Sequence, residues 1–147
     1  MEKSLAAREK IVAHLRDGEI CKGYTRDFDG LRTSFHVYSP ENPVSRSCRI
    51  ELDELKALFY VRSWKGRPGR VERSYSFDQK QHPRGRRAAV RFRDGERIWG
   101  YVLDEEPGDA GFFLIPANPQ DNNLKIFVIH SAMEEISFLP DEVETSH

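Results

Sequence analysis

The residues best suited to binding chemistry lie in one basic stretch in the middle of the chain. From Arg62 to Arg87 there are nine lysines and arginines against two acidic residues, whereas the rest of the chain carries fourteen basic and twenty-two acidic residues. Guanidinium groups hold phosphate through paired N–H donors, and aromatic rings stack on nucleobases. The candidate phosphate or nucleic-acid ligands are Arg67, Arg70, Arg73, Arg84, Arg86, Arg87, Trp64 and Tyr75.

The same charge asymmetry has a second interpretation. The basic stretch is a connector that pairs with the acidic regions on either side of it or with a protein partner. We favour this interpretation, and nucleic-acid or (cyclic di)nucleotide binding through the connector is the alternative. Retention on nucleic acid that falls steeply with salt separates the two.

Catalytic chemistry has little support in the residue pattern. His14, His36 and His130 are isolated, with no neighbouring nucleophile pattern and no metal-ligand spacing. Acidic residues gather near Asp27 and Asp104, but turns commonly take such residues without binding a cation. We therefore predict a protein that is not an enzyme and has no cofactor and no metal site.

The elements that position these residues follow from an internal repeat. Arg16-Asp17-Gly18-Glu19 followed by Gly23 returns as Arg93-Asp94-Gly95-Glu96 followed by Gly100, at an offset of 77 residues. The repeat predicts a tandem duplication of one small β unit. Asp-Gly favours a two-residue hairpin turn with positive φ at both positions. Gly23 and Gly100, in the middle of predicted strands, indicate a sharp bend.

Period-two alternation of apolar residues predicts five short strands in each unit. The expected organisation is a first unit over residues 1–63, a basic linker over 64–86, a second unit over 87–139 and an acidic tail over 140–147. Residues 2–9 fit a short helix that leads into the first strand. The tight turn of the second unit, at residues 130–132, is expected to hold one inserted residue.

The strand pattern resembles the Sm-like family. In that family a bend glycine in the second strand is followed five residues later by Phe and then Asp, as Gly23 is followed by Phe28 and Asp29. The resemblance implies two tandem five-stranded small barrels. Sm-like proteins bind RNA through an Asn and an Arg-Gly turn, and here Arg32-Thr33 and Asp53-Glu54 stand in those places. The RNA site is therefore not carried over.

Two shorter segments resemble other families. The segment from Leu55 to Arg62, which reads LKALFYVR, is similar to the signature of an uncharacterised bacterial family. The segment from Arg87 to Arg91 resembles the Arg-x-x-x-Arg element of PilZ domains, which bind a cyclic dinucleotide. The second motif of PilZ domains is absent from residues 104–108.

Location and role follow from what the sequence contains. No apolar run approaches the roughly 20 residues that span a membrane, and the first residues lack a signal-peptide core. Cys21 and Cys48 are expected to be reduced packing residues. We predict a cytoplasmic, bacterial monomer or homodimer that binds a protein partner through barrel surfaces and strand edges, without contact with membranes.

Overall fold

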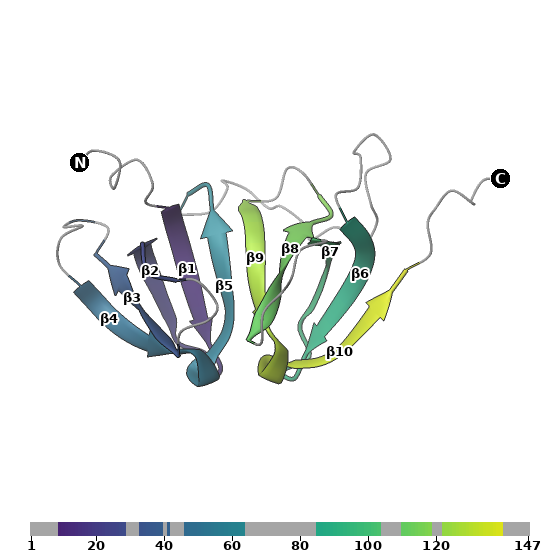
Figure 1. Cartoon of the computed structure of the whole chain (residues 1–147), viewed down its shortest axis with the longest axis horizontal. Coiled ribbons are helices and arrows are strands. Elements are labelled where there is room, and N and C mark those ends of the chain that lie inside the picture. The colour runs from purple at the N-terminus through teal and green to yellow at the C-terminus, as the bar shows by residue number, and fades with distance from the viewer. Residues whose placement is uncertain are drawn as a thin grey trace.

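The computed structural model describes residues 9–28, 33–39, 41, 46–63, 85–103, 110–118 and 122–139. These residues form ten β-strands and two 3-10 turns, and they contain no α-helix (Figure 1). The elements of the first half are β1 (Glu9–Leu15), β2 (Ile20–Thr25), β3 (Ser34–Tyr38), β4 (Arg46–Glu51), η1 (Leu52–Glu54) and β5 (Leu55–Val61). Those of the second half are β6 (Gly85–Phe92), β7 (Arg97–Leu103), β8 (Gly111–Pro116), β9 (Asn123–Ile129), η2 (His130–Ala132) and β10 (Met133–Phe138).

The prediction of an all-β protein is confirmed, but two further expectations need correction. The predicted N-terminal helix is replaced by strand at its last residue, Glu9, and residues 2–8 lie outside the described part of the chain. The ten strands do not form two closed barrels. They form one open antiparallel sheet in the order β10-β6-β7-β8-β9-β5-β1-β2-β3-β4.

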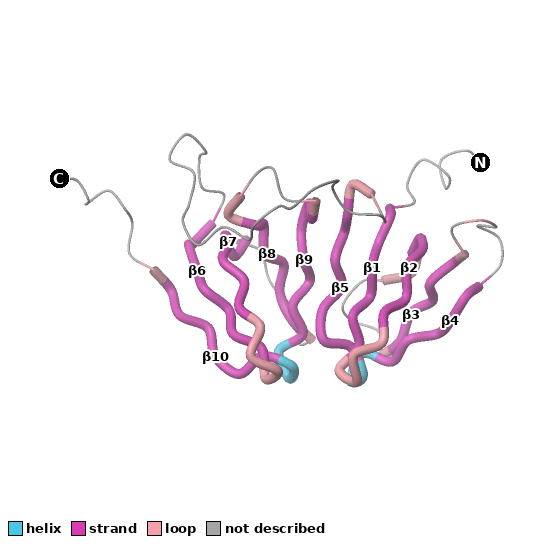
Figure 2. The backbone as a smooth tube through the Cα atoms, turned by 180° about the vertical axis from the view of Figure 1, so that it is seen from behind, coloured by secondary structure: helices cyan, strands magenta, loops and turns pink. Residues whose placement is uncertain are grey.

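The strand β5 is the reason that the barrels do not close. It does not meet β4 of its own half but pairs with β9 of the other half, with Leu58 opposite Phe127. The two bent halves therefore join along β5 and β9 (Figure 2), and β4 and β10 are left as the free edges. When the strands are numbered within each half, both halves have the same side-by-side order: fifth, first, second, third, fourth. A tandem duplication predicts this shared order.

The joint between the halves explains the apolar character of β5, whose seven residues are all buried. Successive side chains of a strand point to opposite faces of the sheet. Leu58 lies opposite Ala13 in the core of the first half. Ala57 and Phe59 share the other face with Val128 and Ile126, in the core of the second half. One strand thus contributes to the hydrophobic core on both of its faces, so six of its seven residues are apolar or aromatic and the seventh, Lys56, is buried as well.

The hairpin turns of both halves differ from the predicted two-residue type. Within these two turns φ is positive at Gly18 and Gly95, at 96° and 97°, and not at the preceding aspartates. In the first turn, Gly18 N–H donates to the Leu15 carbonyl and Leu15 N–H donates to the Glu19 carbonyl. This is a three-residue loop whose left-handed glycine forms a bulge. The Asp17 carboxylate accepts from the Glu19 N–H at 2.9 Å, which holds the loop in place.

The inserted residue of the second half lies before Ile126 of β9 rather than in the tight turn, since Val37 pairs with Cys48 and Leu114 pairs with Ile126. The turns η1 and η2 have the same length. Glu51 pairs with Ser34, and the residue in the corresponding ladder position of the second half is Ile129, which pairs with Gly111. The offset between the halves is therefore already 78 at β9. The prediction of an insertion within residues 130–132 is wrong.

The cysteines also depart from expectation. Cys21 of β2 and Cys48 of β4 are joined by a disulfide across β3, where two reduced residues were predicted. The prediction that both cysteines are reduced is therefore wrong. Among the described residues, no helix is long and apolar enough to cross a membrane.

Candidate functional site

A buried lysine of the first half forms ion pairs with the second half, at the end of the β5–β9 joint where the hairpin turns lie. Lys56 of β5, whose side chain is 11% exposed, donates from Nζ to Asp94 Oδ2 at 2.8 Å and also to Glu96 Oε1. Its ammonium lies 4.8 Å from the centre of the Phe92 ring. Burial would lower the pKa of Lys56, but its hydrogen bonds to Asp94 and Glu96 outweigh burial and raise it.

Two arginines of the repeated turns complete this contact. Arg16 donates to the Ser131 hydroxyl, and Arg93 Nε donates to the Ser131 carbonyl at 2.9 Å. The turns that the sequence marked as structural therefore also connect the halves. Lys56 was not a candidate residue, although a lysine inside the apolar run from Leu55 to Val61 was a signal for a buried ion pair.

The free edge at β10 differs from β5, which occupies the same place in the first half. Equivalent positions of β5 and β10, compared through their pairing with β1 and β6, are occupied by Lys56 and Glu134, by Ala57 and Glu135, and by Phe59 and Ser137. Glu134, Glu135 and Ser137 are exposed. Arg91 lies 2.9 Å from Glu135 and 3.9 Å from Glu134. The β10 edge is therefore polar and acidic where β5 is apolar and carries a lysine.

A histidine and an aspartate form a second polar cluster, at the end of β2. The Asp27 carboxylate accepts from the His36 backbone N–H at 3.0 Å and lies 2.9 Å from His36 Nδ1. Burial opposes ionisation of Asp27, but these hydrogen bonds outweigh it and hold the pKa of Asp27 below its ordinary value. In the described ranges, no three His, Cys, Asp or Glu side chains gather as a metal site.

This cluster gives a pH-dependent prediction. Because the folded pKa of Asp27 is depressed, its stabilisation is complete above the ordinary aspartate value of about 3.9 and is lost as the pH falls through the folded value. We expect Asp27→Asn to be less stable than the parent at neutral pH, and the difference to shrink under acid. Urea midpoints between about pH 7 and 2.5 measure it. The exposed Asp53→Asn is the control, and a difference that stays constant with pH would contradict the assignment.

Most of the basic connector lies outside the described residues. The candidates Trp64, Arg67, Arg70, Arg73, Tyr75 and Arg84 all fall there. Arg86 and Arg87 belong to β6. The guanidinium of Arg86 stacks on the Phe138 ring at 3.8 Å from its centre, and the Arg87 carbonyl accepts from Leu139 N–H. The structure thus places Arg86 against β10, and phosphate binding by the connector stays a prediction.

The observations define the chain as an all-β protein built from one open sheet, whose free edges are β4 and the polar β10. Comparison with protein families adds that residues 7–140 match the model of a family of unknown function, DUF6982. Because the match spans nearly the whole chain, the protein belongs to that family. No curated protein and no solved structure matches the chain.

Proposed function

We propose that this protein is a non-enzymatic interaction module that binds an extended segment of a partner protein along β10. The observation that carries the proposal is the place of β10 in the sheet. It occupies in its half the position that β5 occupies in the other half, and β5 pairs along its outer side with β9. A free strand edge presents unpaired backbone groups, which proteins use to take up a partner strand.

The charges of the edge favour a different protein over a second copy of this chain. In the joint between the halves, Lys56 meets Asp94 and Glu96. If β4 of a second copy paired with β10 as β9 pairs with β5, Asp17 and Glu19 of that copy would take the places of Asp94 and Glu96. Glu134 would then meet two carboxylates, and these like charges would repel. Glu135 and Ser137 also lack the apolar surface of Ala57 and Phe59. The edge therefore fits an extended segment flanked by lysine or arginine.

The test is capture of partners by the tagged full-length chain from its own cell, with cross-linking, followed by hydrogen exchange on the purified complex. We expect slowed exchange of the β10 amides in the complex. Glu134→Lys should weaken capture about tenfold or more, as reversal of a charge across an interface does. The control Glu41→Lys makes the same charge change on an exposed loop residue. Equal capture by both variants, with no slowing at β10, would refute the proposal.

A further inference from the structure

The strand β4 forms the second free edge of the described sheet, at the opposite end from β10 (Figure 1). One hydrogen bond at its C-terminal end fixes which backbone groups face outward: the Leu52 N–H donates to the Thr33 carbonyl at 2.9 Å. In an antiparallel ladder, successive residues direct their N–H and C=O groups to alternate sides. Ile50 therefore faces β3, while Arg49 and Glu51 direct these groups to the free edge.

The side chains of Arg49 and Glu51 carry opposite charges on one face of β4, because residues two apart in a strand share a face. Arg49 Nη2 lies 3.3 Å from Glu51 Oε2, and Arg49 Nε donates to the Ser34 hydroxyl at 3.3 Å. The two charged side chains are 59% and 39% exposed, so their pair adds little to stability by itself. A guanidinium has more donors, and a carboxylate more acceptor sites, than these contacts use, so each can bind a further group.

This arrangement is complementary to itself under a two-fold rotation. If Ile50 of one copy lies opposite Ile50 of a second, Arg49 of each copy lies opposite Glu51 of the other. Both residues direct backbone groups outward, so each of these two cross-strand pairs can form the two hydrogen bonds of an antiparallel pair. Each charge then has an opposite charge beside it on its own strand and across the ladder. A slip of the ladder by two residues in either direction puts Arg49 opposite Arg49 or Glu51 opposite Glu51, so the charges select one register.

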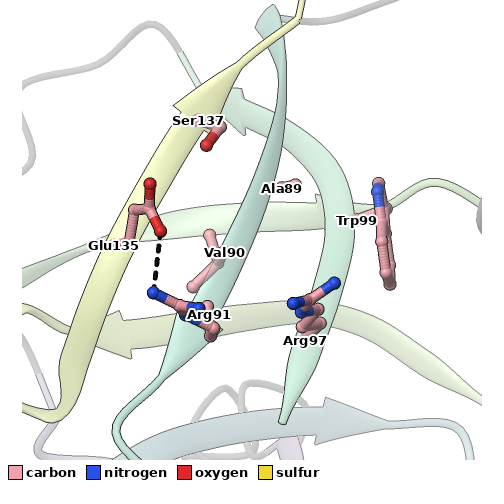
Figure 3. A pocket seen from close by; sticks show the side chains of 7 residues that line it. All are labelled: Ala89, Val90, Arg91, Arg97, Trp99, Glu135 and Ser137. Carbon is pink, nitrogen blue, oxygen red and sulfur yellow. Dashed lines mark hydrogen bonds and ion pairs between the residues drawn. The ribbon is translucent and has the colours of Figure 1, made fainter. Parts of the chain in front are cut away.

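The other free edge does not have this property. The strand β10 carries Glu134 and Glu135 and no basic residue. Arg91 of β6 lies 2.9 Å from Glu135 (Figure 3) and 3.9 Å from Glu134, which sets one arginine against two carboxylates. Two β10 strands side by side would bring four carboxylates together, which is unfavourable. Of the two edges, β4 is the one whose charges match their own two-fold image.

Two features of the fold favour strand pairing at β4. Its counterpart in the second half, β9, uses the equivalent edge to pair with β5, so this edge of the duplicated unit already accepts a strand. The disulfide from Cys48 of β4 to Cys21 of β2 crosses β3 and ties the edge strand to the sheet. A strand that is already held in its paired conformation loses little conformational entropy on binding.

We infer that β4 is a dimerisation edge, which pairs antiparallel with β4 of a second copy of this chain about a two-fold axis at Ile50. The inference does not depend on the partner proposed for β10, because the two edges lie at opposite ends of the sheet. The dimer leaves a β10 edge at each of its ends. A protein with two copies of the segment that β10 takes up would therefore bind the dimer more tightly than the monomer.

The experiment is sedimentation equilibrium of the untagged full chain, without reductant. We expect a reversible monomer–dimer equilibrium with a dissociation constant of about 1–100 µM, since one short strand pair makes a small interface. Amide exchange followed by NMR on the same samples locates the contact. The amides of Arg49 and Glu51 should exchange more slowly as the protein concentration rises, whereas the Ile50 amide, which already faces β3, should change little.

Charge reversals then test the register. Arg49→Glu and Glu51→Arg should each weaken the dimer about tenfold or more, because each places like charges opposite one another. An equimolar mixture of the two variants restores opposite charges across the ladder and should form a heterodimer of about the parent's affinity. The control Glu134→Lys changes a charge on the other edge and should leave the dimer unchanged.

Four results overturn the inference: a chain that stays monomeric throughout the concentration range, a dimer that Arg49→Glu leaves unchanged, a mixture of the two charge variants that does not associate, or a dimer lost on Glu134→Lys. Urea midpoints of the variants at low concentration show that each is folded, because both substituted side chains are exposed and their reversal should change stability little.

Discussion

Gly100→Ala should cost about 3 kcal/mol or more of the free energy of unfolding, although it adds a single methyl group. A Cβ at Gly100 of β7 would lie 2.3 Å from the Ile115 carbonyl oxygen and 2.9 Å from Leu114 Cγ. The first of these atoms belongs to the backbone of the neighbouring strand, so relief requires β8 to move. Forced overpacking of this kind costs about 1–3 kcal/mol and sometimes more. Urea unfolding measures the loss.

The same reasoning applies to Gly23, whose added Cβ would lie 2.2 Å from the Tyr38 carbonyl oxygen. The control is Gly95→Ala, because Gly95 has φ of 97° and no atom within 4 Å of an added Cβ. Only the strain of positive φ acts there, at about 1–2 kcal/mol. If Gly100→Ala costs no more than Gly95→Ala, close approach of the strands is not what requires glycine.

The glycines and the strands were the parts of the fold that the sequence could predict. Alternation in segments such as Phe35 to Val37 marks a strand with one buried face, because the period of a strand is two. Val37 and its counterpart Leu114 are buried, as is Phe92, and Leu15 packs against the same core, which agrees with the alternation in these segments. These features are local, so they survive any arrangement of the sheet.

The partner of β5 could not be predicted from local pattern. The run from Leu55 to Val61 showed burial on both faces, but that burial fits a barrel closed on its own β4 as well as a joint with another half. The resemblance to Sm-like barrels led to the closed form. The choice depends on long-range pairing between β5 and β9, about which a short apolar run carries no information.

The candidate sites depended on long-range pairing for the same reason. The sequence did not mark Arg49, Glu51 or Glu134 as residues of a free edge, because an edge exists only where a strand lacks a neighbour. The sequence instead predicted a site among the aromatic and basic residues of the connector. Most of these residues lie outside the described part of the chain.

Phe127→Ala should cost about 3–5 kcal/mol, the usual range for loss of a buried phenylalanine. Phe127 belongs to β9 of the second half and is 2% exposed. Its ring lies 4.9 Å from the ring of Phe113 in its own half and 4.9 Å from the ring of Phe28 in the first half. Because one side chain fills space between both halves, both should lose stability together in urea.

The control for this variant is Leu124→Ala on the same strand. Leu124 is 46% exposed, so its removal should change the urea midpoint little. In the Phe127→Ala protein, the fluorescence of Trp99 reports on unfolding of the second half. If the second half unfolded at lower urea while the first half kept its midpoint, that result would contradict a shared core.

Amide hydrogen exchange of the unbound full chain tests most directly the claim that the halves form one sheet joined along β5 and β9, with β10 left open. Amides of paired central strands exchange only through large openings, whereas edge amides exchange readily. We predict that the amides of β5 and β9 exchange as slowly as those of β1, and that alternate amides of β10 exchange far faster. Exchange of β5 at the rate of β10 would contradict the joint, and slow exchange along all of β10 would contradict the open edge.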